Sequence, residues 1–199
     1  MMSPRNIERD LQARERKIEH ILDSAIEVMA VKGIGTVSMQ DIAKAANISV
    51  GNLYHYFKSK DEVFEQLLLR GQSEYGRYVT SIANGKNSAV DKLYTICSNW
   101  LSMKNHWAYT ILIHTARTSE TSSKALREQV TSWFTRNLNP VSQIMKQGQD
   151  EGTIKVGNPQ QLAFYFVSLI QGLTLQRPPG AEVPVDINEA DLIGLFRKE

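Results

Sequence analysis

The sequence predicts an all-α protein of about nine helices, with a three-helix head in residues 1–64 and a larger helical domain in residues 65–199. Three observations lead to this prediction. Apolar residues recur at spacings of three and four along most of the chain. Serine or asparagine caps precede several of these stretches, and glycine follows some of them. No segment shows the apolar-polar alternation that is typical of half-buried strands.

The composition is that of an ordinary globular protein, because 42% of the 199 residues are hydrophobic and 22% are charged. No apolar run approaches the roughly 20 residues that cross a bilayer, and no apolar core of a signal peptide follows the charged N-terminus. A single cysteine and four scattered histidines give neither a disulfide nor a metal-ligand spacing. We therefore expect a soluble, cytoplasmic protein with no cofactor, no metal and no membrane partner.

The first helix of the head is expected over residues 14–32, where apolar residues form one helical stripe, and Gly33 is its expected C-terminal cap. The preceding residues 1–13 are expected to form a disordered tail. A basic arm that reaches into a DNA minor groove with Arg5 and Arg9 is the alternative.

Two short helices should follow, joined by a tight turn. The second helix is expected to start at Ser38, with Asp41 three residues later as its capping-box partner. Asn47 suits the turn because asparagine tolerates the left-handed backbone conformation. The third helix is expected over residues 49–56, and residues 59–62 form another capping box that opens the fourth helix.

Residues 38–56 therefore match the length and layout of a helix-turn-helix, whose second helix lies in the DNA major groove with its N-terminal residues at base edges. Three residues come early enough in that helix to face bases. Asn52 can bond adenine, Val50 can touch a thymine methyl group, and Gly51 permits close approach. The spacing alone leaves an ordinary helical protein as an equal alternative.

Polar-tipped rings follow, and phosphate contacts would explain them. Tyr54, His55 and Tyr56 combine rigid rings with hydrogen-bonding tips, and Lys60 stands where the next helix opens. Within residues 32–60 there are four lysines and a single acidic residue, which indicates a polyanionic partner for this part of the chain.

The run TVSMQDIAKAANISVGNLYHYFKSKDEVF, residues 36–64, resembles the signature of the tetracycline-repressor (TetR) family of bacterial transcription regulators. This resemblance implies that Ser38 caps the first motif helix near a phosphate and that Gln40 reaches a base or the backbone. Asn47 stands where glycine is common. The resemblance also implies C-terminal helices that bind an inducer and form a homodimer, which would read a pseudo-palindromic operator on double-stranded DNA.

A helix over residues 162–175 is apolar on nearly every side, although a surface helix should have a polar face. We expect its own core to cover one side and a second subunit to cover another. The segment also resembles the penultimate helix that builds the dimer interface in the family. The candidates for that interface are Leu162, Phe166, Leu169, Ile170 and Leu173.

A ligand pocket between helices would be lined by apolar and aromatic side chains with few polar groups. Because no carboxylate or arginine dominates the available residues, an apolar or aromatic effector is favoured. Gly71 and Gly76 are expected to mark a bend or an end of the helix that leaves the head. Effector binding would shift this helix and change the spacing of the recognition helices. The pocket candidates are Trp100, Met103, Trp107, Tyr109, His114, Trp133 and Phe134.

The sequence thus predicts a repressor that a small molecule releases from its operator. An enzyme is not expected, because no convergent acid, base or nucleophile is found, and no catalytic residue is assigned. A helical protein-interaction or structural module, a regulator without any small-molecule effector, and an activator remain alternatives.

Overall fold

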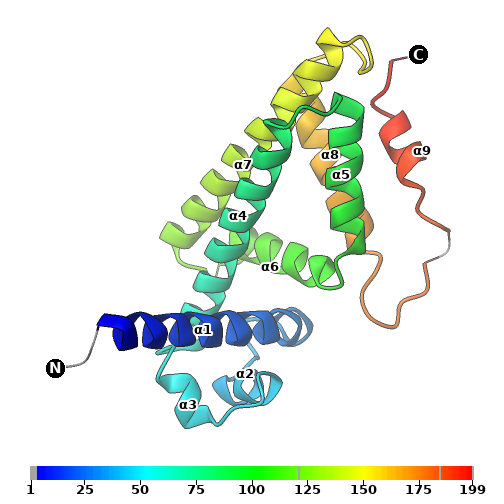
Figure 1. Cartoon of the computed structure of the whole chain (residues 1–199). Coiled ribbons are helices and arrows are strands. Elements are labelled where there is room, and N and C mark those ends of the chain that lie inside the picture. The colour runs from blue at the N-terminus through cyan, green and yellow to red at the C-terminus, as the bar shows by residue number, and fades with distance from the viewer. Residues whose placement is uncertain (1–3, 121, 184, 199) are drawn as a thin grey trace. The chain divides into compact units, whose positions relative to one another are not determined.

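The computed structural model describes residues 4–120, 122–183 and 185–198, and their side chains from residue 8 onward. Within these residues the chain forms nine helices and no strand, so the all-α prediction is confirmed (Figure 1). The residues separate into two compact units, of which one ends at Leu69 and the other begins at Arg70. The helices are α1 (Pro4–Lys32), α2 (Met39–Ala45), α3 (Val50–Tyr54), α4 (Lys60–Ala83), α5 (Ala89–Ser102), α6 (His106–Thr118), α7 (Lys124–Asp150), α8 (Pro159–Thr174) and α9 (Glu189–Gly194).

The first helix is longer than the sequence predicts. It begins at Pro4, where proline is favoured in the first turn, so the prediction of a disordered tail is wrong for residues 4–13. Residues 1–3 lie outside the described residues, as does the side chain of Arg5. At its other end the helix stops as predicted, because Gly33 has a φ of 77° and its amide donates to the Met29 carbonyl.

Helices α2 and α3 form the predicted helix-turn-helix beneath α1 in Figure 1. Ser38 caps α2, and both reciprocal hydrogen bonds of the capping box with Asp41 are present. The turn contains Asn47 with a φ of 52°, the left-handed conformation that the sequence predicts. Ser49 caps α3 by accepting a bond from the Asn52 amide, and α3 ends at Tyr54, earlier than expected.

A compact apolar core holds the head together. Ile21 on α1, Ile42 on α2 and Leu53 on α3 are fully buried, and Phe57 at 1% exposure closes the core after α3. Burying a side chain of this size contributes about 2 kcal/mol relative to leaving it in water. The core therefore fixes the orientation of α3, whose other face remains open to solvent.

The second unit packs α7 against α8, α5 and α6, and α9 covers α5 (Figure 1). Its core contains Phe166 and Ile170 of α8, and the single cysteine, Cys97, is fully buried within it. Burial, with a smaller contribution from the Glu189 charge, raises the pKa of the Cys97 thiol to about 11. No helix among the described residues is long and apolar enough to span a membrane.

The prediction that Gly71 or Gly76 ends a helix is wrong, because α4 continues through both to Ala83. These glycines instead allow close packing within the second unit. A Cβ on Gly71 would overlap the Tyr109 ring of α6, and one on Gly76 would lie 2.5 Å from the Asn137 Oδ1 atom of α7. The cost of glycine in a helix is thus offset by the close approach of two neighbouring helices.

Candidate nucleic-acid interface

The first residues of α3 are open to solvent, as direct contact with bases requires. Gly51 is exposed, and a Cβ built on it would meet nothing within 4 Å. Val50 and Asn52 are half-exposed on the same turn. The backbone amide of Asn52 donates to the Ser49 hydroxyl that caps the helix. The Asn52 side chain takes no part in this bond and is left for other partners. The structure therefore brings the three predicted base-facing residues together.

The ring-bearing residues at the end of α3 and just after it differ in their exposure to solvent. Tyr54 is 54% exposed and His55 is also exposed, which suits both for contacts with a phosphate backbone. Tyr56 is half-buried, and the guanidinium carbon of Arg14 on α1 lies 5.2 Å from the centroid of its ring. Phe57, the next ring along the chain, belongs to the core.

The start of α2 is held by a network of polar contacts. The Asp41 carboxylate accepts bonds from the Ser38 amide (3.0 Å) and hydroxyl (2.8 Å), and it pairs with Lys32 at 2.6 Å. The Lys32 ammonium and the bonds from Ser38 lower the pKa of Asp41 to about 2. Gln40 is exposed beside this network. Ser38 thus acts as a cap, and Gln40 has a side chain available for DNA.

Lys60 has a second task that the sequence did not indicate. Its ammonium group donates to the carbonyl oxygens of Gly35 at 2.9 Å and Val37 at 3.0 Å. These bonds tie the first residue of α4 to the loop before α2. Two donors are therefore used within the protein, and one remains for a phosphate. Lys44 and Lys58, which the sequence analysis did not name as DNA contacts, are exposed on the same unit.

The predicted dimer residues on α8 are mostly on the wrong face. Leu162, Phe166 and Ile170 are 5%, 0% and 0% exposed and pack inside their own unit, so the prediction is wrong for these three. Leu169 and Leu173 are half-buried. The spacing of three and four residues that suggested an interface is the spacing of the core stripe.

The predicted pocket residues also differ in their exposure to solvent. Met103 is 52% exposed and His114 is exposed, so neither lines an interior site and the prediction is wrong for both. Trp133 is half-buried, and the guanidinium carbon of Arg136 lies 4.6 Å from the centroid of one of its rings. Three candidates, Trp100, Trp107 and Phe134, are buried in the second unit, and Tyr109 is half-buried.

Tyr75, which sequence reasoning missed, stacks on Trp100 with ring centroids 4.7 Å apart. Among the described residues, the Tyr75 hydroxyl and the Trp107 indole nitrogen are buried without a hydrogen-bond partner. Desolvation raises the pKa of the Tyr75 hydroxyl, which stays protonated. Such orphaned donors are uncommon in a folded core.

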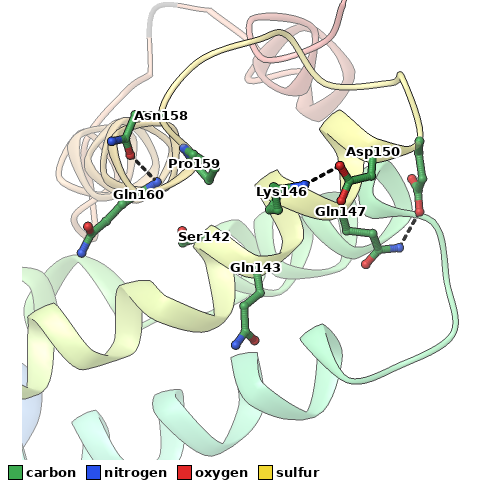
Figure 2. A pocket seen from close by; sticks show the side chains of 9 residues that line it. Ser142, Gln143, Lys146, Gln147, Asp150, Asn158, Pro159 and Gln160 are labelled. Atoms are coloured by element: carbon green, nitrogen blue, oxygen red, sulfur yellow. Dashed lines mark hydrogen bonds and ion pairs between the residues drawn. The ribbon is translucent and has the colours of Figure 1, made fainter.

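An open surface hollow of about 700 Å³ lies elsewhere, between the C-terminal end of α7 and the N-terminal end of α8 (Figure 2). Figure 2 shows its polar lining, including the pair of Lys146 with Asp150 and the hydrogen bond that the Gln160 amide donates to the Asn158 Oδ1 atom. These polar groups are already paired with one another. The hollow contains none of the predicted pocket residues.

Comparison with known proteins supports a DNA-binding role for the head. The family described as bacterial regulatory proteins, tetR family, matches residues 21–67. The fatty acid metabolism regulator protein of Bacillus subtilis is 26% identical over 153 residues, which cover 77% of this chain and 78% of that protein. The transcriptional repressor KstR2 of Rhodococcus jostii is 25% identical over 186 residues, covering 89% and 87%.

Solved structures of transcriptional regulators resemble this chain over most of its length. A TetR/AcrR family member is 25% identical, has a TM-score of 0.71, and covers 91% of this chain and 96% of its own. AibR in complex with isovaleryl coenzyme A and operator DNA has a TM-score of 0.67 at 18% identity, with coverage of 90% and 97%.

The exposed start of α3, the capped helix-turn-helix around it and these similarities lead to one conclusion. Residues 21–67 match the tetR family of bacterial regulatory proteins, and the chain is a DNA-binding transcriptional regulator.

Proposed function

We propose that the protein is a repressor that binds a pseudo-palindromic operator as a homodimer and leaves it when a small-molecule effector binds. The observation that carries this proposal is the open N-terminal turn of α3, with Gly51 unobstructed and flanked by Val50 and Asn52. Repression is favoured because the similar KstR2 is named a transcriptional repressor. Val50, Gly51 and Asn52 would contact bases, and the residues that would hold the backbone are Ser38, Gln40, Tyr54, His55, Tyr56 and Lys60.

The homodimer would form through the outer face of α8. Phe164 and Tyr165 on this face are 46% and 50% exposed, and Leu175 follows just after the helix at 41%. Ser168 and Gly172 lie between them, and small residues allow two helices to approach closely. Because exposed aromatic side chains are enriched at interfaces, a second copy of this helix is the partner that we propose. The half-buried Leu169 and Leu173 would lie at the edge of the contact.

Replacing Phe164 by glutamate is therefore expected to turn the dimer into a monomer, because two buried carboxylates would face each other across the twofold axis. Sedimentation equilibrium would measure the mass of the wild-type and variant proteins. Leu195→Glu is the matched control, since Leu195 is 59% exposed but lies after α9. A variant that keeps the wild-type mass would refute this interface.

The effector is proposed to be an acyl thioester of coenzyme A. Two findings support this choice. The Bacillus relative is named a fatty acid metabolism regulator, and AibR, which shares the fold, was solved with isovaleryl coenzyme A. The interior of the second unit contains aromatic side chains and two buried donors without partners, the Tyr75 hydroxyl and the Trp107 indole nitrogen, and an acyl carbonyl could accept a hydrogen bond from either of them.

The test begins with a DNA duplex selected by the wild-type protein from a random library. Acyl coenzyme A compounds with short, medium and long chains would then be titrated against this complex, with free coenzyme A as the control. We expect one chain-length class to weaken binding at least about tenfold, because release requires a ligand that prefers the unbound conformation. Trp107→Phe keeps the ring but removes the donor, and it should reduce the response.

Equal operator affinity with and without every acyl compound would refute this effector and favour a regulator without a small-molecule ligand of this class. Failure to select any duplex would instead contradict operator binding itself. The two failures are distinguishable because selection is completed before any acyl compound is added.

A further inference from the structure

Arg14 stands outside the helix-turn-helix but next to one of its proposed phosphate contacts. It lies on the N-terminal part of α1, before the segment 21–67 that matches the family. Seven residues make almost two full helical turns, so Arg14 lies on the same face of α1 as Ile21. Since Ile21 is buried in the head core, this face of α1 is the one that looks toward the helix-turn-helix.

The side chain of Arg14 is held in place by an aromatic ring. Its guanidinium carbon lies 5.2 Å from the centroid of the Tyr56 ring, which is the distance of a cation-π contact. A cation-π contact of this kind uses none of the guanidinium N–H groups as hydrogen-bond donors to an oxygen, so they are left for a phosphate. Arg14 is exposed, and no ion pair joins it to a carboxylate of the described residues.

We propose that Arg14 and Tyr56 together form a clamp for one phosphate of the DNA backbone. This inference rests on the proposed binding of the operator through α3. Tyr56 would contribute its hydroxyl and the platform of its ring, and Arg14 would contribute a pre-positioned positive charge. An arginine that is already held by a cation-π contact loses less conformational freedom on binding than a free surface lysine does. The interface with DNA therefore extends from α3 to the beginning of α1.

The experiment compares Arg14→Gln with Arg16→Gln, using the duplex selected by the wild-type protein and a salt series. Both variants remove one exposed positive charge from α1. Arg16 is two residues further on, about 200° around the helix, and serves as the matched control. Circular dichroism melting would verify that each variant is folded.

Loss of one phosphate contact should lower the slope of log affinity against log salt by about 0.9 for each protomer bound. We expect this change in Arg14→Gln, with affinity at low salt reduced by roughly tenfold, and wild-type behaviour in Arg16→Gln. The Tyr56→Leu variant removes the ring, so adding Arg14→Gln to it should change the affinity less than twofold. Tyr56→Phe keeps the ring and should retain the slope contribution of Arg14.

Identical slopes for Arg14→Gln and Arg16→Gln would overturn the clamp while leaving operator binding through α3 intact. Equal losses from Arg14→Gln in the wild-type and Tyr56→Leu backgrounds would also overturn it, because Arg14 would then act without the ring. If the wild-type protein selects no duplex, the proposed operator binding fails and the clamp fails with it.

Discussion

Replacing Gly51 by glutamate is expected to weaken operator binding by about 100-fold or more without unfolding the head. The new side chain would stand where α3 comes closest to the bases, and its charge would oppose the phosphates. Juxtaposing like charges at an interface costs several kcal/mol, and each 1.4 kcal/mol is about tenfold in affinity. The fold should tolerate the change, because a Cβ at Gly51 meets nothing within 4 Å and glutamate favours helix formation.

The measurement is a titration of the selected duplex by fluorescence anisotropy, together with a thermal melt of the protein. Gly194→Glu is the matched control, since Gly194 is exposed on α9, meets nothing within 4 Å and undergoes the same change in charge. A Gly51→Glu protein that binds as tightly as Gly194→Glu would show that α3 does not approach the bases.

Replacing Gly148 by valine is expected to lower the free energy of unfolding of the second unit by about 3 kcal/mol. A Cβ at this position would overlap the Ile154 side chain, lying 2.9 Å from its Cβ atom, and would lie 3.0 Å from the Cβ atom of Ala89. Neither neighbour can withdraw easily. The Gly148 carbonyl accepts the amides of Thr153 at 2.8 Å and Ile154 at 3.0 Å, so the backbone is fixed on both sides.

Urea denaturation followed by tryptophan fluorescence reports on this unit, because all three tryptophans lie after residue 69. Gly194→Val places the same side chain in open space and should change the free energy of unfolding by less than about 1 kcal/mol. If Gly148→Val denatured at the wild-type urea concentration, the close packing around Gly148 would be disproved.

Local signals in the sequence were sufficient for the caps and turns of the head. Ser38 with Asp41, Gly33 and Asn47 act within a few residues of chain, and each adopts the cap or turn that its chemistry favours. Such features depend on neighbours in sequence, so a single chain contains the information needed to predict them.

The second unit was harder to predict because its features depend on contacts between distant residues. Gly71 was read as a helix breaker, although Tyr109 of α6 explains why only glycine fits there. On α8, apolar residues occupy both faces, and hydropathy could not tell the core residue Phe166 from the exposed Phe164. The second role of Lys60 depends on backbone carbonyls more than twenty residues away, which carry no signal in the sequence.

The buried position of Cys97 also determines how readily its thiol reacts with electrophiles and oxidants. A thiol whose pKa is about 11 carries almost no thiolate at neutral pH, and thiolate is the form that electrophiles and oxidants attack. Because Cys97 is the only cysteine, the folded chain has no cysteine through which to sense oxidation. Alkylation of Cys97 instead requires the second unit to open, so the rate at which Cys97 is labelled measures that opening.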